Sequence, residues 1–470
     1  MKKAISCVGF LTLLFFTIYS VYSIISWKDT TGDYLSSTQQ LYATEEDLMD
    51  VVFVGSSHCY CTVFPEKLWS EYGIAAFDMA ISGQDKHSSY HTLKEVLKTQ
   101  TPEVVFVEMY GLLYDGYLVE GNLYRNMLAL KLSRNSIELV QDVAEEEEQL
   151  DYILRWPIVH TRYKELDKYD FIQYAPSEYG RGSNVVWEIG YSEKPVAANA
   201  CDVVGQLGEE NEEWLNELYQ LSLDNDFELV FFLAPMIVQE EEQPIINAAK
   251  EYAEERNIDF LDFNRLADTV GLDYKTDFCN SFHCNVYGGV KITAFIGEYL
   301  AQNYALNDNR GDEKYAQWED AYTYYEQVED TQELKKAQTI GEYVECLQSM
   351  RHITYVVSLE GDYKKLGLDL KNAMLSLGMT EEEYKEGGTF LCVDGVLQKV
   401  LDANSMETYI YELNAYDSFK IQNKALLEED ANSLSDIMFN LQSVGSVNNG
   451  VSFAVYDDFR EEFINQKGFF

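Results

Sequence analysis

Short runs of β-prone apolar residues alternate with amphipathic segments up to about residue 305. The runs begin at residues 50, 73, 102, 227 and 258, in DVVFVGSS, GIAAFDMAIS, PEVVFVEMY, FELVFFLAP and IDFLDFN. Between them, segments such as HTLKEVLKTQ and IINAAKEYAEERN place apolar residues at intervals of three and four, the period of a helix. Continuous apolar strands separated by helices are typical of a parallel sheet covered by helices on both faces. We therefore expect an α/β domain over residues 31–305.

Three further stretches depart from this pattern. Residues 112–215 carry few strand signals but much helical, aromatic and acidic sequence, so we expect a helical insertion over the edge or top of the sheet that could act as a lid. Residues 306–345 are polar, charged and periodic, as in a helical connector. From residue 346 to 470, β-prone runs alternate with Gly and Asn turns around one helix at 364–377, which predicts a second, β-rich domain.

The amino terminus is apolar. Residues 4–27 contain no charged side chain and follow Lys2 and Lys3. As a helix this run would span about 36 Å, more than a hydrocarbon core of about 30 Å. It is longer than the core of a signal peptide and has no convincing Ala-x-Ala site, which favours an uncleaved anchor over residues 1–30 and leaves a removed signal as the alternative. Lysines before the helix predict a cytoplasmic amino terminus and extracellular main domains.

The net charge of the sequence limits the kinds of molecule that the protein can bind. The chain holds 80 Asp and Glu against 35 Lys and Arg, a formal net charge of -45. Such a surface argues against nucleic-acid binding and against adhesion to anionic lipid, so we expect the membrane to be reached through the amino-terminal helix alone.

Gly55-Ser56-Ser57-His58 ends the first apolar run. Catalytic groups gather at the carboxyl ends of parallel strands, and a glycine there permits a tight turn that presents the next hydroxyl. A nucleophilic serine needs a histidine base and a group that orients this base. His283 follows the last strand of the predicted sheet and precedes a helix, so it should lie at the same end. The alternative is a serine that only caps a helix.

The strand-Gly-x-Ser motif, combined with the HCNVYGG block that begins at His283, resembles the SGNH/GDSL hydrolase superfamily over about residues 48–303. The resemblance extends to its membrane-anchored bacterial envelope members. It implies a flavodoxin-like sheet, Ser57 as nucleophile, His283 as base, and oxyanion N–H groups near Ser57 and Gly83, with Ser56 and His58 beside the nucleophile. It further implies a serine esterase or O-acyltransferase that acts on acyl esters of an envelope polysaccharide or teichoic-acid-like polymer, without cofactor or metal.

Two positions depart from that family. Glu108 follows the third strand, where the family has an asparagine of the oxyanion hole, and Asn280 stands three residues before His283, where the family has an aspartate. An amide can orient an imidazole but stabilises the imidazolium less, and Asp277 could take over this role. A second function therefore stays open, a catalytically degenerate protein that binds glycans or assists assembly at the cell surface.

Other residues carry weaker signals. Two cysteine pairs flank the predicted site and could form a disulfide, remain free thiols or, least plausibly, bind a metal: Cys59, Cys61, Cys279 and Cys284. Arg162, in the stretch 155–171, could recognise a phosphate or carboxylate of the polymer, or belong to a helix packed through Trp156 and Tyr163.

Two remaining features are ambiguous. His87 and His91 lie four residues apart and could meet a ligand, although an ordinary helix surface is the simpler interpretation. Near the carboxyl terminus, Asn449-Gly450, a β-prone run that ends in Tyr456-Asp457, and a terminal Gly468-Phe469 loosely resemble interleukin-like β domains of the ILEI type, which suggests a glycan- or partner-binding module.

Overall fold

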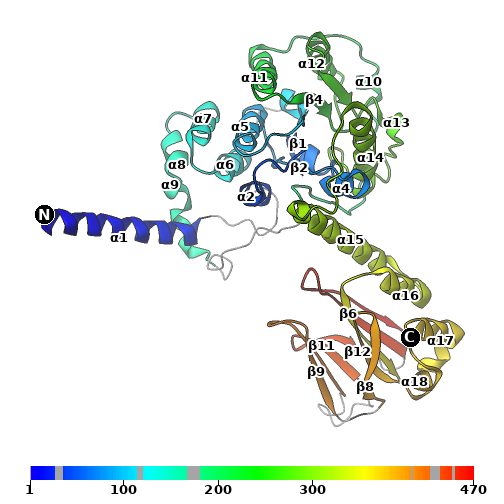
Figure 1. The fold of residues 1–470 in the computed structure, drawn as a ribbon. Helices are drawn as coiled ribbons and strands as arrows, with labels where there is room; N and C mark the ends of the chain where they lie inside the picture. Colours follow the sequence, from blue (N-terminus) through cyan, green and yellow to red (C-terminus); the bar gives the residue numbers. More distant parts are fainter. Residues whose placement is uncertain are drawn as a thin grey trace. The chain divides into compact units, whose positions relative to one another are not determined.

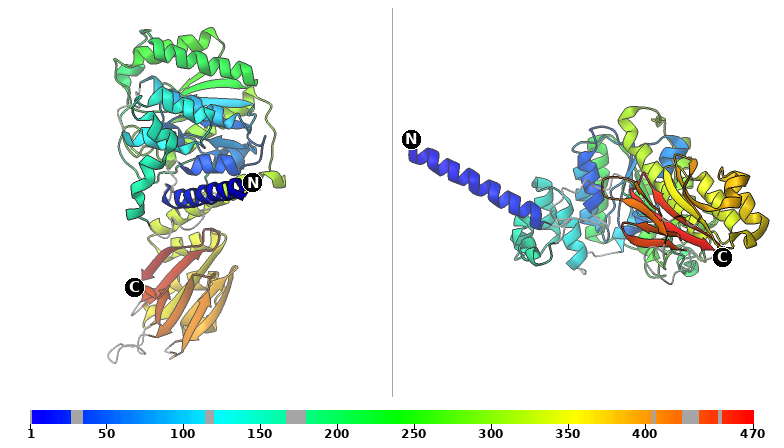
Figure 2. Two further views of the ribbon diagram at one scale, coloured as in Figure 1. Left: turned by 90° about the vertical axis from the view of Figure 1, so that its left-hand side faces the viewer. Right: turned by 90° about the horizontal axis from the view of Figure 1, so that it is seen from below.

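The computed structural model describes residues 2–26, 35–113, 120–166, 180–403, 405, 407–423, 435–446 and 450–470. Residues 27–30 of the predicted anchor, and parts of the predicted insertion, lie outside the described residues. The chain forms two compact units, Met1–Tyr322 and Thr323–Phe470. Figures 1 and 2 show the helices and strands of each unit, coloured by their position in the sequence.

A five-stranded parallel sheet in the order β2-β1-β3-β4-β5 lies at the centre of the first unit. Its strands are β1 (Val51–Val54), β2 (Ala76–Asp78), β3 (Val104–Glu108), β4 (Glu228–Leu233) and β5 (Asp259–Asp262). Each of the five predicted runs forms one strand, and the order is flavodoxin-like, so the predicted fold class is confirmed. The order also places β1 and β3 side by side, which brings their carboxyl ends together.

Helices cover both faces of the sheet, because alternate strand residues point into two separate cores. Val52 and Val54 face one core, while Val51 and Phe53 face a second core on the other side of the sheet. The first face carries α5 (Lys86–Val96), α11 (Glu209–Asn225) and α12 (Gln243–Glu255); the second carries α4 (Pro65–Tyr72) and α14 (Val286–Asn303).

The described part of the insertion between β3 and β4 is mainly helical up to Lys164, whereas residues 183–195 form neither helix nor strand before α10. It contains η1 (Met109–Leu112), α6 (Glu120–Ala129), α7 (Arg134–Val143), α8 (Gln149–Leu154), α9 (Trp156–Val159), η3 (His160–Lys164) and α10 (Val196–Asn199). Helices α6 to α8 bury a small core of their own, and α7 packs on α5. The His91 ring is buried in this contact, bonded to Asn135 Oδ1 at 2.7 Å and Asp142 Oδ2 at 2.8 Å. The interpretation of His91 as a helix surface residue is therefore wrong.

The amino-terminal helix α1 (Lys2–Ile25) is apolar and mostly exposed, and its stretch Ser6–Ile25 is long and apolar enough to cross a membrane. Short helix α2 (Leu35–Ala43) follows. The guanidinium of Arg162 donates to the carbonyl oxygens of Ile25 and Ser26, at the carboxyl end of α1. Arg162, proposed from the sequence to bind polymer, is thus placed on the end of α1.

The second unit is mainly antiparallel β, as predicted. One sheet has the order β14-β13-β6-β7-β8 and the other β12-β11-β10-β9. The strands are β6 (Ile353–Glu360), β7 (Gly388–Val393), β8 (Val396–Asp402), β9 (Thr408–Glu412), β10 (Ser418–Asn423), β11 (Ser435–Phe439), β12 (Gln442–Ser446), β13 (Gly450–Asp457) and β14 (Glu462–Phe469). Facing side chains such as Val356 and Phe419 form a core between the sheets.

Helices cover the outer face of the larger sheet in this unit. They are α16 (Ile340–Ser349), α17 (Gly367–Ser376) and α18 (Glu381–Glu386). The predicted connector contains one long helix, α15 (Ala316–Lys336), in which the boundary between the two units falls. Trp318 near its start is buried and donates to the carbonyl of Ala76 at 2.7 Å, so the connector begins within the first unit's core.

Candidate active site

The turn after β1 separates the roles of the two serines. Residue 55 must be glycine, because a Cβ there would lie 2.5 Å from the Cβ of Glu108 on the neighbouring strand. Ser56 is the N-cap of α3 (Ser57–Tyr60), and its Oγ accepts a hydrogen bond from the backbone N–H of His58 at 3.3 Å. Since Ser56 provides the cap, the hydroxyl of Ser57 is available for another partner.

That partner is His283. Ser57 Oγ lies 2.8 Å from His283 Nε2, and His283 Nδ1 lies 3.0 Å from Asn280 Oδ1. Ser57 and Asn280, the outer residues of this hydrogen-bonded series, are 223 positions apart in the sequence (280 minus 57). The sheet topology brings them together at one end of the sheet. A hydroxyl, an imidazole and an orienting group in hydrogen-bond contact are the components of an activated serine nucleophile.

The loop around Asn280 determines which tautomer of His283 is present. Asn280 Oδ1 also accepts from the backbone N–H groups of Phe282 at 2.9 Å and of His283 at 3.1 Å. The amide nitrogen cannot accept these bonds, so the oxygen must face the ring. His283 Nδ1 therefore carries the proton, and Nε2 presents its lone pair to Ser57. This is the tautomer that a general base needs.

A compact loop holds His283 in place. Residues Phe278 and Cys284 pair as an antiparallel bridge, and Cys279 N donates to His283 O at 3.0 Å. Asn285, fully buried, caps α14 by accepting from Tyr287 N at 3.0 Å. Its amide nitrogen donates back into the loop and to the segment that precedes α10, at Thr276 O, Phe278 O and Glu188 O. Asn285 was not among the predicted site residues, although its place in the HCNVYGG block was a signal for it.

Asp277 does not contact the imidazole. Its carboxylate accepts from Lys291 Nζ at 2.6 Å, from Asp273 N at 2.8 Å and from the Thr276 hydroxyl at 2.9 Å. Residue 288 must be glycine here, since a Cβ would lie 2.3 Å from the carbonyl oxygen of Asp277. The suggestion that Asp277 replaces the missing aspartate is therefore wrong, and its role is to anchor the loop on α14.

The carboxyl group of Glu108 links the backbone at the carboxyl ends of β1, β3 and β4. It accepts from Tyr110 N at 3.0 Å, and backbone N–H groups of Ser56 and Ala234 also bond to its carboxyl group. Burial raises the pKa of Glu108 to about 8, so it is uncharged near neutral pH. The buried Asp78 at the end of β2 behaves alike, since burial raises its pKa to about 8. Two neutral acids thus flank the nucleophile turn and position the backbone.

The stacked rings of His58 and Tyr110 lie next to the turn that carries Ser57. His58 is buried and stacks on Tyr110, with ring centroids 4.2 Å apart, and its centroid lies 4.8 Å from that of His283. Burial, followed by the proximity of His283, holds the pKa of His58 well below its usual value. Burial also lowers the pKa of His283. Both imidazoles are therefore neutral near pH 7, as a general base must be.

Backbone donors are available for a developing oxyanion. Gly83, with φ of 63°, lies in a loop that packs on the nucleophile turn, where Gly55 N donates to Gln84 Oε1 and Ile81 N donates to Gly55 O, both at 3.1 Å. Within the described part of the chain, neither the N–H of Ser57 nor that of Gly83 has an acceptor. Two such donors beside a nucleophile can stabilise the negative charge of a tetrahedral intermediate.

Exposed apolar side chains form a rim on the loop that holds His283 and on the segment that crosses this loop. Phe282 is 46% exposed, and Ile189 and Tyr191 are 55% and 61% exposed. These last two belong to the segment before α10 that crosses the loop, where Gly190 N donates to Phe278 O at 2.8 Å. The part of the insertion that reaches the site is therefore an extended segment.

Neither the four cysteines near the site nor the other four of the chain form a disulfide. Cys59 donates to Asp78 Oδ2 at 3.3 Å, and Cys279 lies 3.7 Å from the carbonyl oxygen of Cys284. The disulfide considered from the sequence is therefore absent. In the ranges that the structure describes, no three His, Cys, Asp or Glu side chains converge as a metal site would require.

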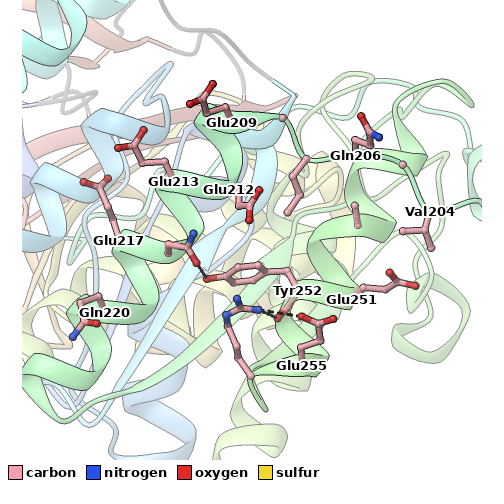
Figure 3. Close-up of a pocket in the computed structure, with 16 residues that line it drawn as sticks. Val204, Gln206, Glu209, Glu212, Glu213, Glu217, Gln220, Glu251, Tyr252 and Glu255 are labelled. Carbon is pink, nitrogen blue, oxygen red and sulfur yellow. Dashed lines mark hydrogen bonds and ion pairs between the residues drawn. The ribbon is translucent and has the colours of Figure 1, made fainter.

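A groove of about 1060 Å³ lies elsewhere on the first unit, between α11 and α12. Figure 3 shows its acidic lining, which includes Glu209, Glu213 and Glu251, and the hydrogen bond from the Tyr252 hydroxyl to Asn216 at 2.8 Å. Its lining includes neither Ser57 nor His283, so the volume of a cavity does not identify the reactive centre here.

No protein-family model matches the sequence, and no curated protein is significantly similar to it.

Proposed function

We propose that this protein is a serine esterase or O-acyltransferase of the SGNH type. The observation that carries the proposal is the hydrogen-bonded chain Ser57–His283–Asn280, together with the amide orientation that leaves His283 Nε2 free to accept a proton. The flavodoxin-like sheet and the free N–H groups of Ser57 and Gly83 support it further.

The reaction would take place in two halves. Ser57 Oγ attacks the acyl carbonyl carbon while His283 Nε2 takes the hydroxyl proton, and the N–H groups of Ser57 and Gly83 hold the oxyanion. The ester bond breaks, and His283 returns the proton to the leaving alcohol. Water or a sugar hydroxyl then attacks the carbonyl carbon of the acyl-enzyme and gives its proton to His283. The bond from this carbon to Ser57 Oγ breaks, and His283 returns the proton to Ser57 Oγ.

The substrate we propose is an acyl ester on a cell-envelope polymer. The apolar rim at Phe282 suits an acyl group, and helix α1 would hold the protein in the membrane with Lys2 and Lys3 on the cytoplasmic side. The net charge of -45 favours a neutral glycan over a polyanionic teichoic acid.

Labelling the full-length chain with a fluorophosphonate probe tests the proposal. Wild-type protein should be labelled, Ser57→Ala should not, and His283→Ala should react at least a hundredfold more slowly. Ser56→Ala is a matched control, because it removes the neighbouring hydroxyl and the helix cap but leaves the nucleophile. The absence of labelling in folded wild-type protein would refute catalysis and favour a glycan-binding or assembly factor.

A further inference from the structure

Helices α8, α9 and η3 of the insertion expose large apolar side chains. Leu150 and Leu154 of α8 are 62% and 57% exposed, Trp156 of α9 is 38% exposed, and Tyr163 of η3 is 63% exposed. Leu150 and Leu154 lie four residues apart on one side of α8, whereas Tyr152 between them is buried in the insertion's own core. We call these four exposed residues the α8–η3 surface. A cluster of exposed large apolar residues marks a site of contact with another molecule or a lipid.

This surface is continuous with the carboxyl end of α1. The ring of Trp156 stacks on that of Tyr22 with centroids 6.4 Å apart, and Arg162 Nη1 lies 3.1 Å from the carbonyl oxygen of Ile25 and also bonds to that of Ser26. The last carbonyls of a helix have no partner within the helix and carry partial negative charge, which the guanidinium offsets. The exposed apolar side chains therefore begin where the apolar helix ends, as the position of α9 beside α1 in Figure 1 illustrates.

The charges of this segment differ from those of the chain as a whole. Residues 155–164 read RWPIVHTRYK and contain no acidic residue, in a chain with a net charge of -45. Tryptophan and tyrosine are enriched at the membrane–water interface, and arginine and lysine bury their stems there while the charged ends stay in water. Residues 155–164 combine aromatic, apolar and basic side chains at the end of a membrane-length helix, which is the chemistry of the lipid headgroup region, and α8 adds Leu150 and Leu154 on either side of the exposed Asp151.

We propose that the α8–η3 surface rests in the outer leaflet of the membrane, with Leu150, Leu154 and Trp156 among the lipid chains. The inference rests on the proposed membrane insertion of α1 and is independent of the proposed catalysis. Docking at a second point would restrain the α/β domain against the membrane surface. It would hold the site close to the bilayer, so the polymer it serves would be one that is attached to, or assembled at, the membrane.

Photo-crosslinking in a reconstituted membrane tests this inference. The full-length chain is produced with p-benzoylphenylalanine in place of Leu154, inserted into phosphatidylcholine vesicles, irradiated and analysed for lipid adducts by mass spectrometry. Leu223 on α11, which is 58% exposed, is the matched control, and Leu13 within α1, 68% exposed, is the positive control. We expect lipid adducts at position 13 and at position 154, with at least tenfold more at 154 than at 223.

The other outcomes overturn the inference in distinguishable ways. Lipid adducts at 13 but none at 154 would refute the docking and leave the anchor intact. No adduct at 13 would refute membrane insertion, and with it the docking. Crosslinks from 154 to a second copy of the chain would assign the surface to self-association. Fluorophosphonate labelling of the same vesicles reports the catalytic proposal separately.

Discussion

Replacing Asn280 by aspartate should accelerate the chemistry of Ser57. Asn280→Asp puts a negative charge about 3.0 Å from His283 Nδ1, in the place of a neutral oxygen. Coulomb's law gives about 1.4 kcal/mol at a water-like dielectric of ~80 and about 5.5 kcal/mol at ~20. Because Asn280 is exposed, the lower value applies. It corresponds to an increase of about one unit in the pKa of His283 and to an approximately tenfold faster reaction.

The assay is the second-order rate of fluorophosphonate labelling between pH 4 and 9, with 4-nitrophenyl acetate hydrolysis as a second readout. Burial lowers the pKa of His283, so wild-type activity should persist into mildly acidic solution and fall only below the usual histidine range. The Asn280→Asp variant should lose activity about one pH unit higher. Asn372→Asp, an exposed site in the second unit, controls for the added charge. An unchanged rate and an unchanged acid limb would refute the orientation of Asn280 towards the ring.

Two further predictions concern the supports of the site. Burial raises the pKa of Glu108 from 4.5 to about 8, so the folded state keeps a proton that the unfolded state loses above pH ~4.5, and stability falls as pH rises towards 8. Glu108→Gln should reduce that slope by about 1.4 kcal/mol per pH unit between pH 5 and 7.5, seen in urea unfolding; an unchanged slope would show that Glu108 is ionised. Asn285→Ala removes the side-chain donor that bonds to the buried carbonyls of Thr276 and Phe278. We expect the free energy of unfolding to fall by about 2–4 kcal/mol and fluorophosphonate labelling to become slower. A variant of unchanged stability would contradict the role of Asn285 in the loop.

β1, β3 and β4 could be predicted because burial on both faces leaves few polar positions in them. β1 and β3 are apolar at nearly every residue, and that continuity is visible without a structure. The antiparallel unit was harder. β11, β12 and β14 mix polar and apolar residues, as in SDIMF, QSVGS and EFINQKGF, so their sequences resemble loops until pairing places them.

The site was predictable only in part. Ser57 and His283 follow strands whose ends must meet, so their approach follows from topology. Contacts that depend on a third element could not be read from local sequence. Arg162 bonds to backbone carbonyls at the end of α1, 136 and 137 positions away in the sequence. His91 bonds to side chains of α7, 44 and 51 positions away. Only the fold determines which of several plausible polar partners a side chain reaches.

Asn280 shows how such a contact changes a functional argument. On sequence alone, an amide in place of aspartate suggests lost catalysis, since an asparagine that turns its nitrogen to the histidine would impose the wrong tautomer. Two backbone N–H groups, from Phe282 and His283, prevent that rotation by binding the same oxygen. The loop thereby keeps the tautomer that a base requires, and the loss is confined to the stabilisation of the imidazolium. Under the proposed function, the departure at this position therefore predicts a slower hydrolase or transferase, with the acid limb of its pH profile shifted down, in place of an inert protein.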